Sequence, residues 1–304
     1  MEKIQDTADR IKSLEVKGAR KVAMAAVEAL QDLAEETKAR SPEEFLDDIS
    51  EARETLFASR PTEPLMRNAV RFVTMKVENS DKKKVSDLAE IVSSSSQEFL
   101  SSLDASRKRI AEIGEKRIHD GMVVFTHCHS STVTQLLRKA CQEGKTFEVI
   151  CTETRPVFQG RITAKEMIDL DIKTTFIVDS AARSFMKKAD IVIVGADAIT
   201  SEGSIINKIG TSTIALLASE ARVPFYIGSE LLKFDPATLS GEYETIEERS
   251  EDEVWIDAPE ELAVRNPAFE VTKRNFIHGL ICEEGIIPPH LITEVMLRKH
   301  PWIF

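Results

Sequence analysis

Two patterns of apolar residues divide the chain near residue 118. In the first part, apolar residues recur at helical spacing among Ala, Glu, Lys and Leu, which are strong helix formers. This pattern predicts helices over residues 16–39, 63–78 and 84–114. The second helix follows a boundary marked by Pro61. The serine cluster VSSSSQEF lies inside the third, and we interpret it as a polar helix face because apolar residues continue on both sides. We predict a helical N-terminal domain over residues 1–118.

From residue 119 onward, short apolar runs rich in β-branched residues alternate with helical patterns. The predicted strands are 122–127, 147–153, 174–179, 190–197 and 224–229. Continuous apolar strands separated by helices indicate a parallel sheet that is covered on both faces. We therefore predict an α/β fold: the helical domain is followed by a Rossmann-like, doubly wound domain over residues 119–304.

Polar residues follow each predicted strand. They are His127–Ser131, Glu153–Pro156, Asp179–Arg183, Gly195–Thr200 and Ser229–Lys233. In doubly wound sheets, ligands bind beyond the carboxyl ends of the strands. We expect these five segments to face one crevice.

Cys128 ends the first predicted strand and precedes a helix that starts near Ser131. The first turn of a helix presents free N–H groups and the positive end of the helix dipole, which predicts a lowered pKa for the thiol. The same N–H groups, with the hydroxyls of Ser130, Ser131 and Thr132, form a candidate phosphate site. The alternative is a buried structural cysteine with capping serines.

Two further features near the strand ends bear on chemistry. His127, Cys128 and His129 have the composition of a zinc site, but adjacent residues of an extended chain point to opposite faces and cannot easily converge on one ion. We predict no metal. Asp197 follows an apolar run, where burial would raise its pKa and allow it to donate a proton. A turn or N-cap aspartate is the alternative.

Basic and amide side chains supply the remaining candidates. Asn207 and Lys208 precede a helix N-terminus that carries Gly and two hydroxyls, and Lys233 follows the last predicted strand. A lysine beside the N–H groups of a helix N-terminus can bind phosphate, although the spacing of these residues is not that of a Walker loop. The sheet also lacks GxGxxG, so no nicotinamide cofactor is expected.

The helical half contributes further cations. Lys17, Gly18, Ala19 and Arg20 form a basic turn before a long helix, and Arg60 precedes Pro61. Each charged residue here could also be an ordinary solvated surface charge.

Composition and charge exclude several classes of protein. The 304 residues are 42% hydrophobic and 30% charged, with a net charge of −11. The negative charge disfavours nucleic acid binding through general electrostatics. No apolar run approaches the roughly 18 residues of a membrane span, and the N-terminus lacks the apolar core of a signal peptide. Four cysteines without a CxxC pair favour a reducing cytoplasm.

A series of motifs between residues 125 and 290 ties these candidates together. In order they are THCHSS, TETRPVFQG, VDSAAR, VGADAIT, INKIGT, LLKFDP, NPAFEVT and GIIPP. The chain resembles the family that unites the regulatory subunits of translation initiation factor eIF2B, methylthioribose-1-phosphate isomerase and archaeal ribose-1,5-bisphosphate isomerase. The resemblance is weakest in residues 1–55 and 80–115.

The resemblance implies an enzyme. The enzymes of this family use a cysteine after the first sheet strand and an aspartate in the GAD loop, and Cys128 and Asp197 match both. The SRPTEP stretch and the chain length are similar to the bisphosphate branch. The implied reaction converts α-D-ribose 1,5-bisphosphate to D-ribulose 1,5-bisphosphate in AMP and nucleoside degradation, without a cofactor. An eIF2B-like regulatory subunit and methylthioribose-1-phosphate isomerase are the alternatives.

The same resemblance implies a set of substrate contacts and a homo-oligomer, either a dimer or a hexamer. The contacts are Lys17, Gly18, Ala19, Arg20, Arg60, Ser130, Ser131, Thr132, Asn207, Lys208 and Lys233. One departure concerns the N-terminal motif, which is usually Arg-Gly-Ala followed by a small residue. Here Lys17 and Arg20 occupy its first and last positions.

Overall fold

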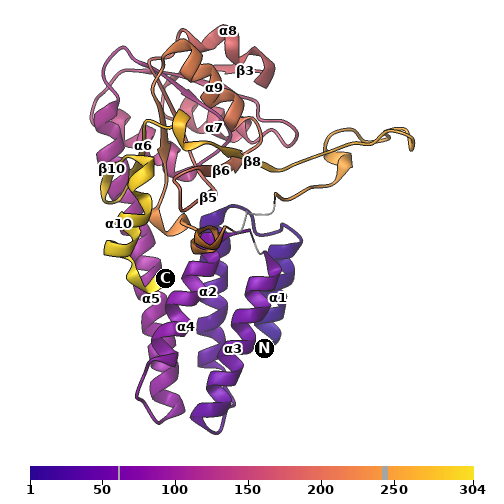
Figure 1. The fold of residues 1–304 in the computed structure, drawn as a ribbon, viewed down its shortest axis with the longest axis vertical. Helices are drawn as coiled ribbons and strands as arrows, with labels where there is room; N and C mark the ends of the chain where they lie inside the picture. Colours follow the sequence, from indigo (N-terminus) through magenta and orange to yellow (C-terminus); the bar gives the residue numbers. More distant parts are fainter. Residues whose placement is uncertain (61, 242–245) are drawn as a thin grey trace. The chain divides into compact units, whose positions relative to one another are not determined.

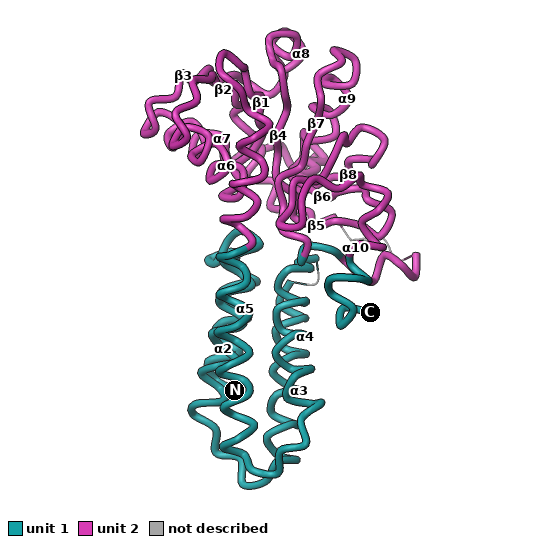
Figure 2. The backbone as a smooth tube through the Cα atoms, turned by 90° about the vertical axis from the view of Figure 1, so that its left-hand side faces the viewer, with its two compact units in different colours: residues 1–105, 232–234, 296–304 teal, residues 106–231, 235–295 magenta. Residues whose placement is uncertain are grey.

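The computed structural model describes residues 1–60, 62–241 and 246–304. The predicted boundary at Pro61 lies outside these residues. The chain forms two compact units, which Figure 2 colours separately. Unit 1 comprises Met1–Ala105, Leu232–Phe234 and Met296–Phe304, and unit 2 comprises Ser106–Leu231 and Asp235–Val295.

Unit 1 is built from helices (Figure 1). They are α1 (Glu2–Lys12), α2 (Ala19–Glu35), α3 (Pro42–Ser59), α4 (Pro64–Glu78) and the first part of α5 (Val85–Gly114). Helix α2 packs against α1 and α4, and α3 packs against α1 and α4. The apolar positions at helical spacing on α2, including Val22, Ala26 and Leu30, are fully buried. The three helices predicted in this part of the chain are confirmed.

Helix α5 runs without a break through the serine cluster, so its interpretation as helix is confirmed. The cluster does not face only solvent, because Ser95 and Ser96 are buried. The hydroxyl of Ser95 donates to the carbonyl of Ile91, one turn earlier, at 2.6 Å. A serine can be buried in a helix when its hydroxyl bonds back to the preceding turn in this way.

The main element of unit 2 is a seven-stranded sheet in the order β10-β9-β7-β4-β1-β2-β3. Its strands are β1 (Val123–Thr126), β2 (Glu148–Thr152), β3 (Lys173–Ile177), β4 (Ile191–Val194), β7 (Phe225–Gly228), β9 (Gly279–Cys282) and β10 (Gly285–Ile287). All neighbouring pairs are parallel except β9 with β10. The five predicted strands correspond to β1, β2, β3, β4 and β7. A helical N-terminal region followed by a mostly parallel sheet is therefore confirmed.

Helices connect the parallel strands. They are α6 (Ser131–Gln142), α7 (Gly160–Ile168), α8 (Ala182–Met186) and α9 (Thr211–Ala221), with α10 (Ile292–Lys299) near the C-terminus. The linking 3₁₀ turns are Glu115–Arg117, Asp179–Ala181, Leu231–Lys233, Pro236–Ser240, Glu251–Glu253, Arg274–Phe276, Pro289–Leu291 and Pro301–Ile303.

A small second sheet was not predicted. It consists of β5 (Ala198–Ile199), β6 (Ile205–Lys208) and β8 (Phe269–Thr272), and both of its pairings are antiparallel. Asn207 and Lys208, expected in a loop before a helix, are the last two residues of β6. The short apolar pair Ile205–Ile206 gave too little pattern to identify a strand from sequence.

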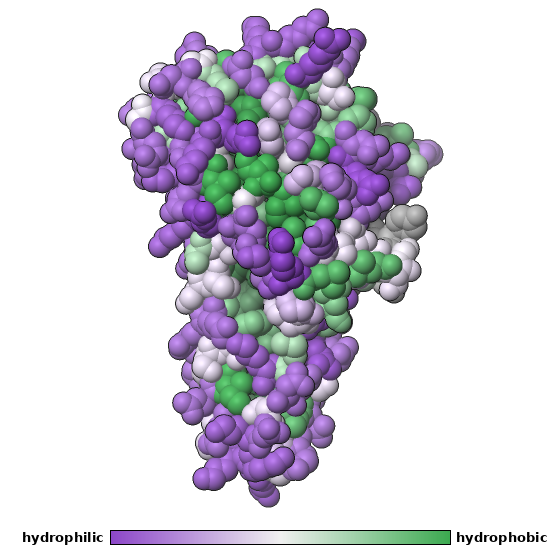
Figure 3. Space-filling model, turned by 60° about the vertical axis from the view of Figure 1, so that its left-hand side comes forward, coloured by the Kyte–Doolittle hydropathy of each residue, from purple (hydrophilic) through white to green (hydrophobic). Residues whose placement is uncertain are grey.

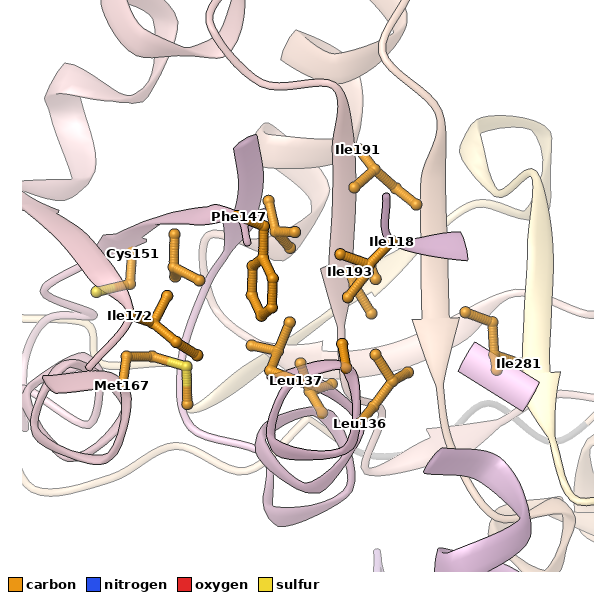
Figure 4. Close-up of a cluster of buried hydrophobic side chains, with 14 of the residues drawn as sticks. Ile118, Leu136, Leu137, Phe147, Cys151, Met167, Ile172, Ile191, Ile193 and Ile281 are labelled. Carbon is orange, nitrogen blue, oxygen red and sulfur yellow. The ribbon is translucent and has the colours of Figure 1, made fainter. Parts of the chain in front are cut away.

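The core of unit 2 lies between the large sheet and its helices. Leu136 and Leu137 of α6 point into this core, where Phe147 and Ile193 also lie (Figure 4). Cys151 is fully buried in the same cluster and acts as a small apolar residue. The face shown in Figure 3 is mostly hydrophilic, with apolar patches between the polar side chains. Among the described residues, no helix has the length and apolar character that crossing a membrane requires.

Candidate active site

Cys128 lies directly after β1, in a backbone conformation that side chains rarely adopt. Its φ angle is 67°, in the left-handed region, and the residue is only 8% exposed. Its backbone N–H donates to the hydroxyl of Thr154 at 2.9 Å, and its carbonyl accepts from the hydroxyl of Thr163 at 2.9 Å. The thiol is thus carried by a strained and firmly bonded residue at the carboxyl end of a central strand.

Burial raises the pKa of the Cys128 thiol to about 12. The positive charge of Lys208 and a hydrogen bond from the backbone of His129 act in the opposite direction, while the negative charges of Asp197 and Asp179 raise the pKa further. The predicted lowering of this pKa is therefore wrong. Helix α6 begins three residues later, and the loss of water around the sulfur is the largest cause acting on the thiol.

The loops that carry the candidate catalytic residues approach each other closely at two glycines, Gly195 and Gly210. A Cβ on Gly195 would lie 2.6 Å from the hydroxyl oxygen of Ser130, so only glycine lets the loop after β4 approach the loop after β1. A Cβ on Gly210 would lie 2.8 Å from Nε2 of His127. Unit 2 therefore brings the loops that contain Cys128 and Asp197 close to the end of β6, which carries Lys208.

Asp197 and Lys208 are the other two candidate active-site residues near Cys128. Asp197 is half-buried, and its backbone N–H donates to the carbonyl of Ile206 at 2.9 Å. Lys208 is 4% exposed, and its Nζ lies 4.9 Å from the ring centroid of Phe269. Burial lowers the pKa of Lys208, whereas the charges of Cys128 and Asp197 raise it. The charge of Asp197 thus acts on both the Cys128 thiol and the Lys208 amine.

The N-terminus of α9 already holds a carboxylate. Oε1 of Glu270 accepts the backbone N–H groups of Gly210 at 2.7 Å and Ser212 at 2.9 Å. The amide of Asn207 donates to the hydroxyl of Thr211 at 3.0 Å. Glu270 therefore takes two of the N–H groups that the sequence suggested for phosphate.

The N-terminus of α6 offers a different environment. Ser130 is its N-cap and accepts the N–H of Val133 at 3.4 Å, while Ser131 is exposed. The hydroxyl of Thr132 donates to Oε1 of the buried Glu230 at 3.2 Å. In this turn the carboxylate of Glu230 binds a side-chain hydroxyl, whereas at the start of α9 the carboxylate of Glu270 binds backbone N–H groups.

Lys17–Arg20 lie in unit 1 at the start of α2. Gly18 is the N-cap with φ 88°, and the side chain of Lys17 is exposed. Arg20 bonds within the helical unit: its guanidinium donates to the carbonyl of Leu103 at 2.9 Å and to the carboxylate of Asp104 at 2.6 Å. Arg20 therefore links α2 to α5.

Arg60 and Lys233 lie near the start of α4, also in unit 1. A guanidinium nitrogen of Arg60 is 3.5 Å from the carboxylate of the buried Glu63. Asn68, in the second turn of α4, donates to the carbonyls of Leu232 and Phe234, both at 2.8 Å. These two bonds fix the segment that carries Lys233, which is 7% exposed.

Sequence reasoning missed several residues of the site. Thr154, Thr163 and Glu270 bind backbone groups of the loops, and Glu283, at the end of β9, has a pKa raised to about 7 by burial. Hydroxyls and carboxylates that bind distant backbone groups leave no local pattern in the sequence, although Thr154 lies in the segment Glu153–Pro156 at a predicted strand end. Across the described residues, no group of three or more His, Cys, Asp or Glu side chains is arranged to hold a metal ion.

The fold is that of an α/β protein with a mostly parallel sheet, and Cys128 and Asp197 follow the carboxyl ends of β1 and β4, where sheets of this kind bind ligands. A model of the Initiation factor 2 subunit family matches residues 15–289. The chain is 45% identical to ribose 1,5-bisphosphate isomerase from Archaeoglobus fulgidus, covering 98% of this chain and 94% of the relative. The chain therefore belongs to the Initiation factor 2 subunit family.

Two other similar proteins carry different names. Methylthioribose-1-phosphate isomerase from Pelotomaculum thermopropionicum is 34% identical, with 93% of this chain and 82% of the relative covered. The crystal structure of translation initiation factor eIF-2B from Pyrococcus horikoshii OT3 has a TM-score of 0.82 at 33% identity, covering 95% of this chain and 98% of that one.

Proposed function

We propose that the protein is an isomerase that converts α-D-ribose 1,5-bisphosphate to D-ribulose 1,5-bisphosphate. The observation that carries this proposal is the convergence of the segments bearing Cys128, Asp197 and Lys208, in a chain that is 45% identical to a ribose 1,5-bisphosphate isomerase. In this proposal the reaction serves AMP and nucleoside degradation. The strand order, with β1 beside both β2 and β4, supports a Rossmann-like, doubly wound domain over 119–304 after a helical domain over 1–118.

The chemistry needs one acid and one base. An aldose 1-phosphate is locked as a ring because its anomeric oxygen is esterified. The ring oxygen must gain a proton as its bond to C1 breaks, and C2 must lose its hydrogen to give an enol phosphate. The C2 hydroxyl then loses its proton while C1 gains one, which yields the ketose.

The raised pKa of the Cys128 thiol supports the following distribution of these roles. A thiol with a pKa of about 12 begins the reaction protonated, so Cys128 donates to the ring oxygen. Asp197 removes the C2 proton and later returns it to C1. The thiolate, formed next to Lys208, takes the proton of the C2 hydroxyl and becomes a thiol again. These roles are the reverse of those that the sequence favours, in which Asp197 donates a proton and the Cys128 thiol has a lowered pKa. The scheme uses no metal or organic cofactor.

Two phosphates require two cationic sites. The first turn of α6, with Ser130, Ser131 and Thr132, is proposed to hold one of them. Asn207 and Lys208 remain proposed substrate contacts, as do Lys17–Arg20, Arg60 and Lys233 of unit 1. The carboxylate of Glu270 at the start of α9 disfavours a phosphate at that helix end.

The proposed assembly is a homo-oligomer, a dimer or a hexamer, since closed symmetric assembly is usual for enzymes of this kind. Exposed apolar side chains such as Trp255 (53% exposed) and Ile256 (69% exposed) support burial against another copy. Light scattering that gives the mass of a monomer at micromolar concentration would contradict this part of the proposal.

The substrate is tested by incubating the purified protein separately with ribose 1,5-bisphosphate and with methylthioribose 1-phosphate. Ketose formation is followed by NMR. We expect turnover of the bisphosphate alone. Turnover of the methylthio compound would establish the second isomerase activity instead, which the relative at 34% identity keeps as a candidate. Absence of turnover with both would favour a regulatory subunit, as the likeness to the eIF-2B structure suggests.

A binding experiment tests the second phosphate site. Arg60→Ala and Lys233→Ala are titrated calorimetrically with ribose 1,5-bisphosphate and with ribose 1-phosphate. A charge-assisted contact contributes roughly 1.5–3 kcal/mol, so the bisphosphate dissociation constant should rise about 10- to 150-fold while that of the monophosphate barely changes. Equal weakening of both ligands would remove the two residues from a separate phosphate site.

A further inference from the structure

A series of hydrogen-bonded side chains connects the backbone of Cys128 to the neighbouring strands. Its N–H donates to the hydroxyl of Thr154 at 2.9 Å, and that oxygen lies 3.3 Å from the hydroxyl of Thr152. The hydroxyl of Thr152 lies 2.6 Å from Nδ1 of His127, whose Nε2 lies 2.9 Å from the carbonyl of Ile209. All of these groups are in unit 2, and the threonines and His127 are buried.

The direction of each bond in this chain follows from the state of His127. A carbonyl oxygen only accepts, so Nε2 of His127 carries the hydrogen that binds Ile209. Burial lowers the pKa of His127, so the ring is neutral and Nδ1 accepts from Thr152. Thr154 can then donate to Thr152 while its lone pairs accept the N–H of Cys128.

A second hydroxyl fixes the other side of the same residue. Thr163, from α7, donates to the carbonyl of Cys128 at 2.9 Å and lies 3.2 Å from Nδ1 of His129. Because Thr163 uses its own hydrogen on the carbonyl, His129 is the donor in the second contact. Both backbone polar groups of Cys128 are therefore bound by threonine hydroxyls from other elements.

These hydrogen bonds hold two residues in unfavourable backbone conformations. Cys128 has φ 67° and Thr154 has φ 60°, and left-handed conformations are unfavourable for both, most of all for a β-branched residue. Such conformations persist only where the surroundings impose them. The backbone N–H groups of Thr154 and Arg155 both donate to the carboxylate of Asp179, at 2.9 and 2.8 Å, which holds Thr154 in place.

We propose that Thr154 is a positioning residue for Cys128, supported by Thr152 and His127, and that its hydroxyl holds Cys128 in the left-handed conformation in which the thiol acts on the substrate. This inference rests on the proposed isomerase function. Thr154 touches no reacting atom in this scheme. It acts through the backbone of the residue that does.

Two substitutions of Thr154 distinguish the effect of its hydroxyl from the effect of its β-branched shape. Thr154→Val keeps the β-branched shape and so the same strain at φ 60°, but it loses the acceptor for the N–H of Cys128. Thr154→Ser keeps the acceptor. Thr174→Val is the matched control, because the hydroxyl of Thr174, on β3, bonds to the carbonyl of Ile172 instead.

Turnover is the first readout. In Thr154→Val, kcat should fall roughly 10- to 100-fold, as expected for a lost hydrogen bond and an unsatisfied buried N–H, while KM stays within a few-fold. Thr154→Ser should recover most of kcat, and Thr174→Val should match the wild type. Wild-type kcat in Thr154→Val, or a loss that serine does not restore, would overturn the positioning role.

The second readout does not depend on the isomerase activity. The rate at which iodoacetamide alkylates Cys128 is measured against pH by peptide mass, with Cys128→Ser marking the site among the four cysteines. The charged groups that act on the thiol are Lys208, Asp197 and Asp179. In Thr154→Val the released thiol should react faster and at lower pH than in the wild type and in Thr154→Ser. An unchanged profile would overturn the proposal.

Failure of the proposed isomerase function and failure of the positioning role of Thr154 give different results. If the wild type does not isomerise ribose 1,5-bisphosphate, the proposed function falls, and the alkylation profiles alone decide the positioning role. If Thr154→Val does not fold, Thr152→Val replaces it, because that change removes the hydroxyl that lies between Thr154 and His127. The expected kcat loss and alkylation shift are then the same in direction, and their absence contradicts the proposal.

Discussion

The imidazole of His127 lies directly against Gly210, with Nε2 at 2.8 Å from where a Cβ of that residue would be. This contact joins the loop after β1 to the start of α9. Gly210 also has φ 103°, a conformation that favours glycine. Both facts make position 210 intolerant of any side chain.

We expect Gly210→Ala to displace His127 and to lose both stability and activity. The backbone conformation alone costs about 1–2 kcal/mol, and the contact with the ring adds to it. Gly144→Ala is the control, since Gly144 also has positive φ but a Cβ added there would meet no atom within 4 Å. Chemical denaturation should show a larger loss for Gly210→Ala. Equal losses in the two variants would mean that the contact with His127 is unimportant.

A second prediction separates Arg20 from Lys17, which the sequence grouped as substrate contacts. Arg20→Ala should lower the free energy of unfolding by about 1–2 kcal/mol, because it removes bonds to Leu103 and Asp104 across α2 and α5. Lys17→Ala should leave stability unchanged, because its side chain is exposed. Urea denaturation of both variants measures the difference. Equal stability of Arg20→Ala and the wild type would contradict the structural role.

The periodic parts of the chain could be predicted from sequence, and the contacts between distant segments could not. Apolar runs gave β1, β2, β4 and β7, because strands buried on both faces leave a strong pattern. Strand β3 lies at the edge of the sheet and is mostly exposed or half-buried, and its β-branched residues identified it. Strand β6 was missed because its apolar residues are few and it pairs with β8, far along the chain. A long-range pairing of two short segments has no local signature.

The same distinction applies to the site. Cys128 and Asp197 could be picked out because each follows an apolar strand. The carboxylate of Glu270, which accepts backbone N–H groups at the N-terminus of α9, could not be predicted from sequence because Glu270 lies on a strand far along the chain. The pKa of Cys128 was misjudged for a related reason. Its helix is visible in the sequence, whereas its burial depends on the complete fold.

The catalytic assignment gives a third prediction. Cys128→Ser and Asp197→Asn should each lower turnover of ribose 1,5-bisphosphate by about 10²–10⁴-fold or more, because each removes a group that transfers protons. Both proteins should remain folded by circular dichroism. Cys141→Ser and Asp169→Asn change the same residue types elsewhere in unit 2 and should keep wild-type activity. Activity within a few-fold of the wild type in either site variant would remove that residue from the mechanism.

The last prediction concerns Glu283, whose carboxylate accepts the N–H of Leu231 with both oxygens at 3.2 Å. Burial is the main cause that raises its pKa from 4.5 to about 7, and the charges of Glu230 and Glu284 add to the effect. Between these pH values the folded protein keeps a proton that the unfolded chain has already released. Raising the pH through this range therefore lowers the free energy of unfolding.

Glu283→Gln should remove this pH dependence, because glutamine keeps the shape and one acceptor oxygen but does not titrate. The wild type should lose at most about 3 kcal/mol relative to the variant as the pH rises from 4.5 to 7, and less to the extent that water reaches the half-buried carboxyl. Glu284→Gln removes only one of the lesser causes of the raised pKa and should keep most of the pH dependence of the wild type. The measurement is urea denaturation across this pH range. Parallel curves for Glu283→Gln and the wild type would show that Glu283 releases its proton at the same pH in the folded and unfolded chains.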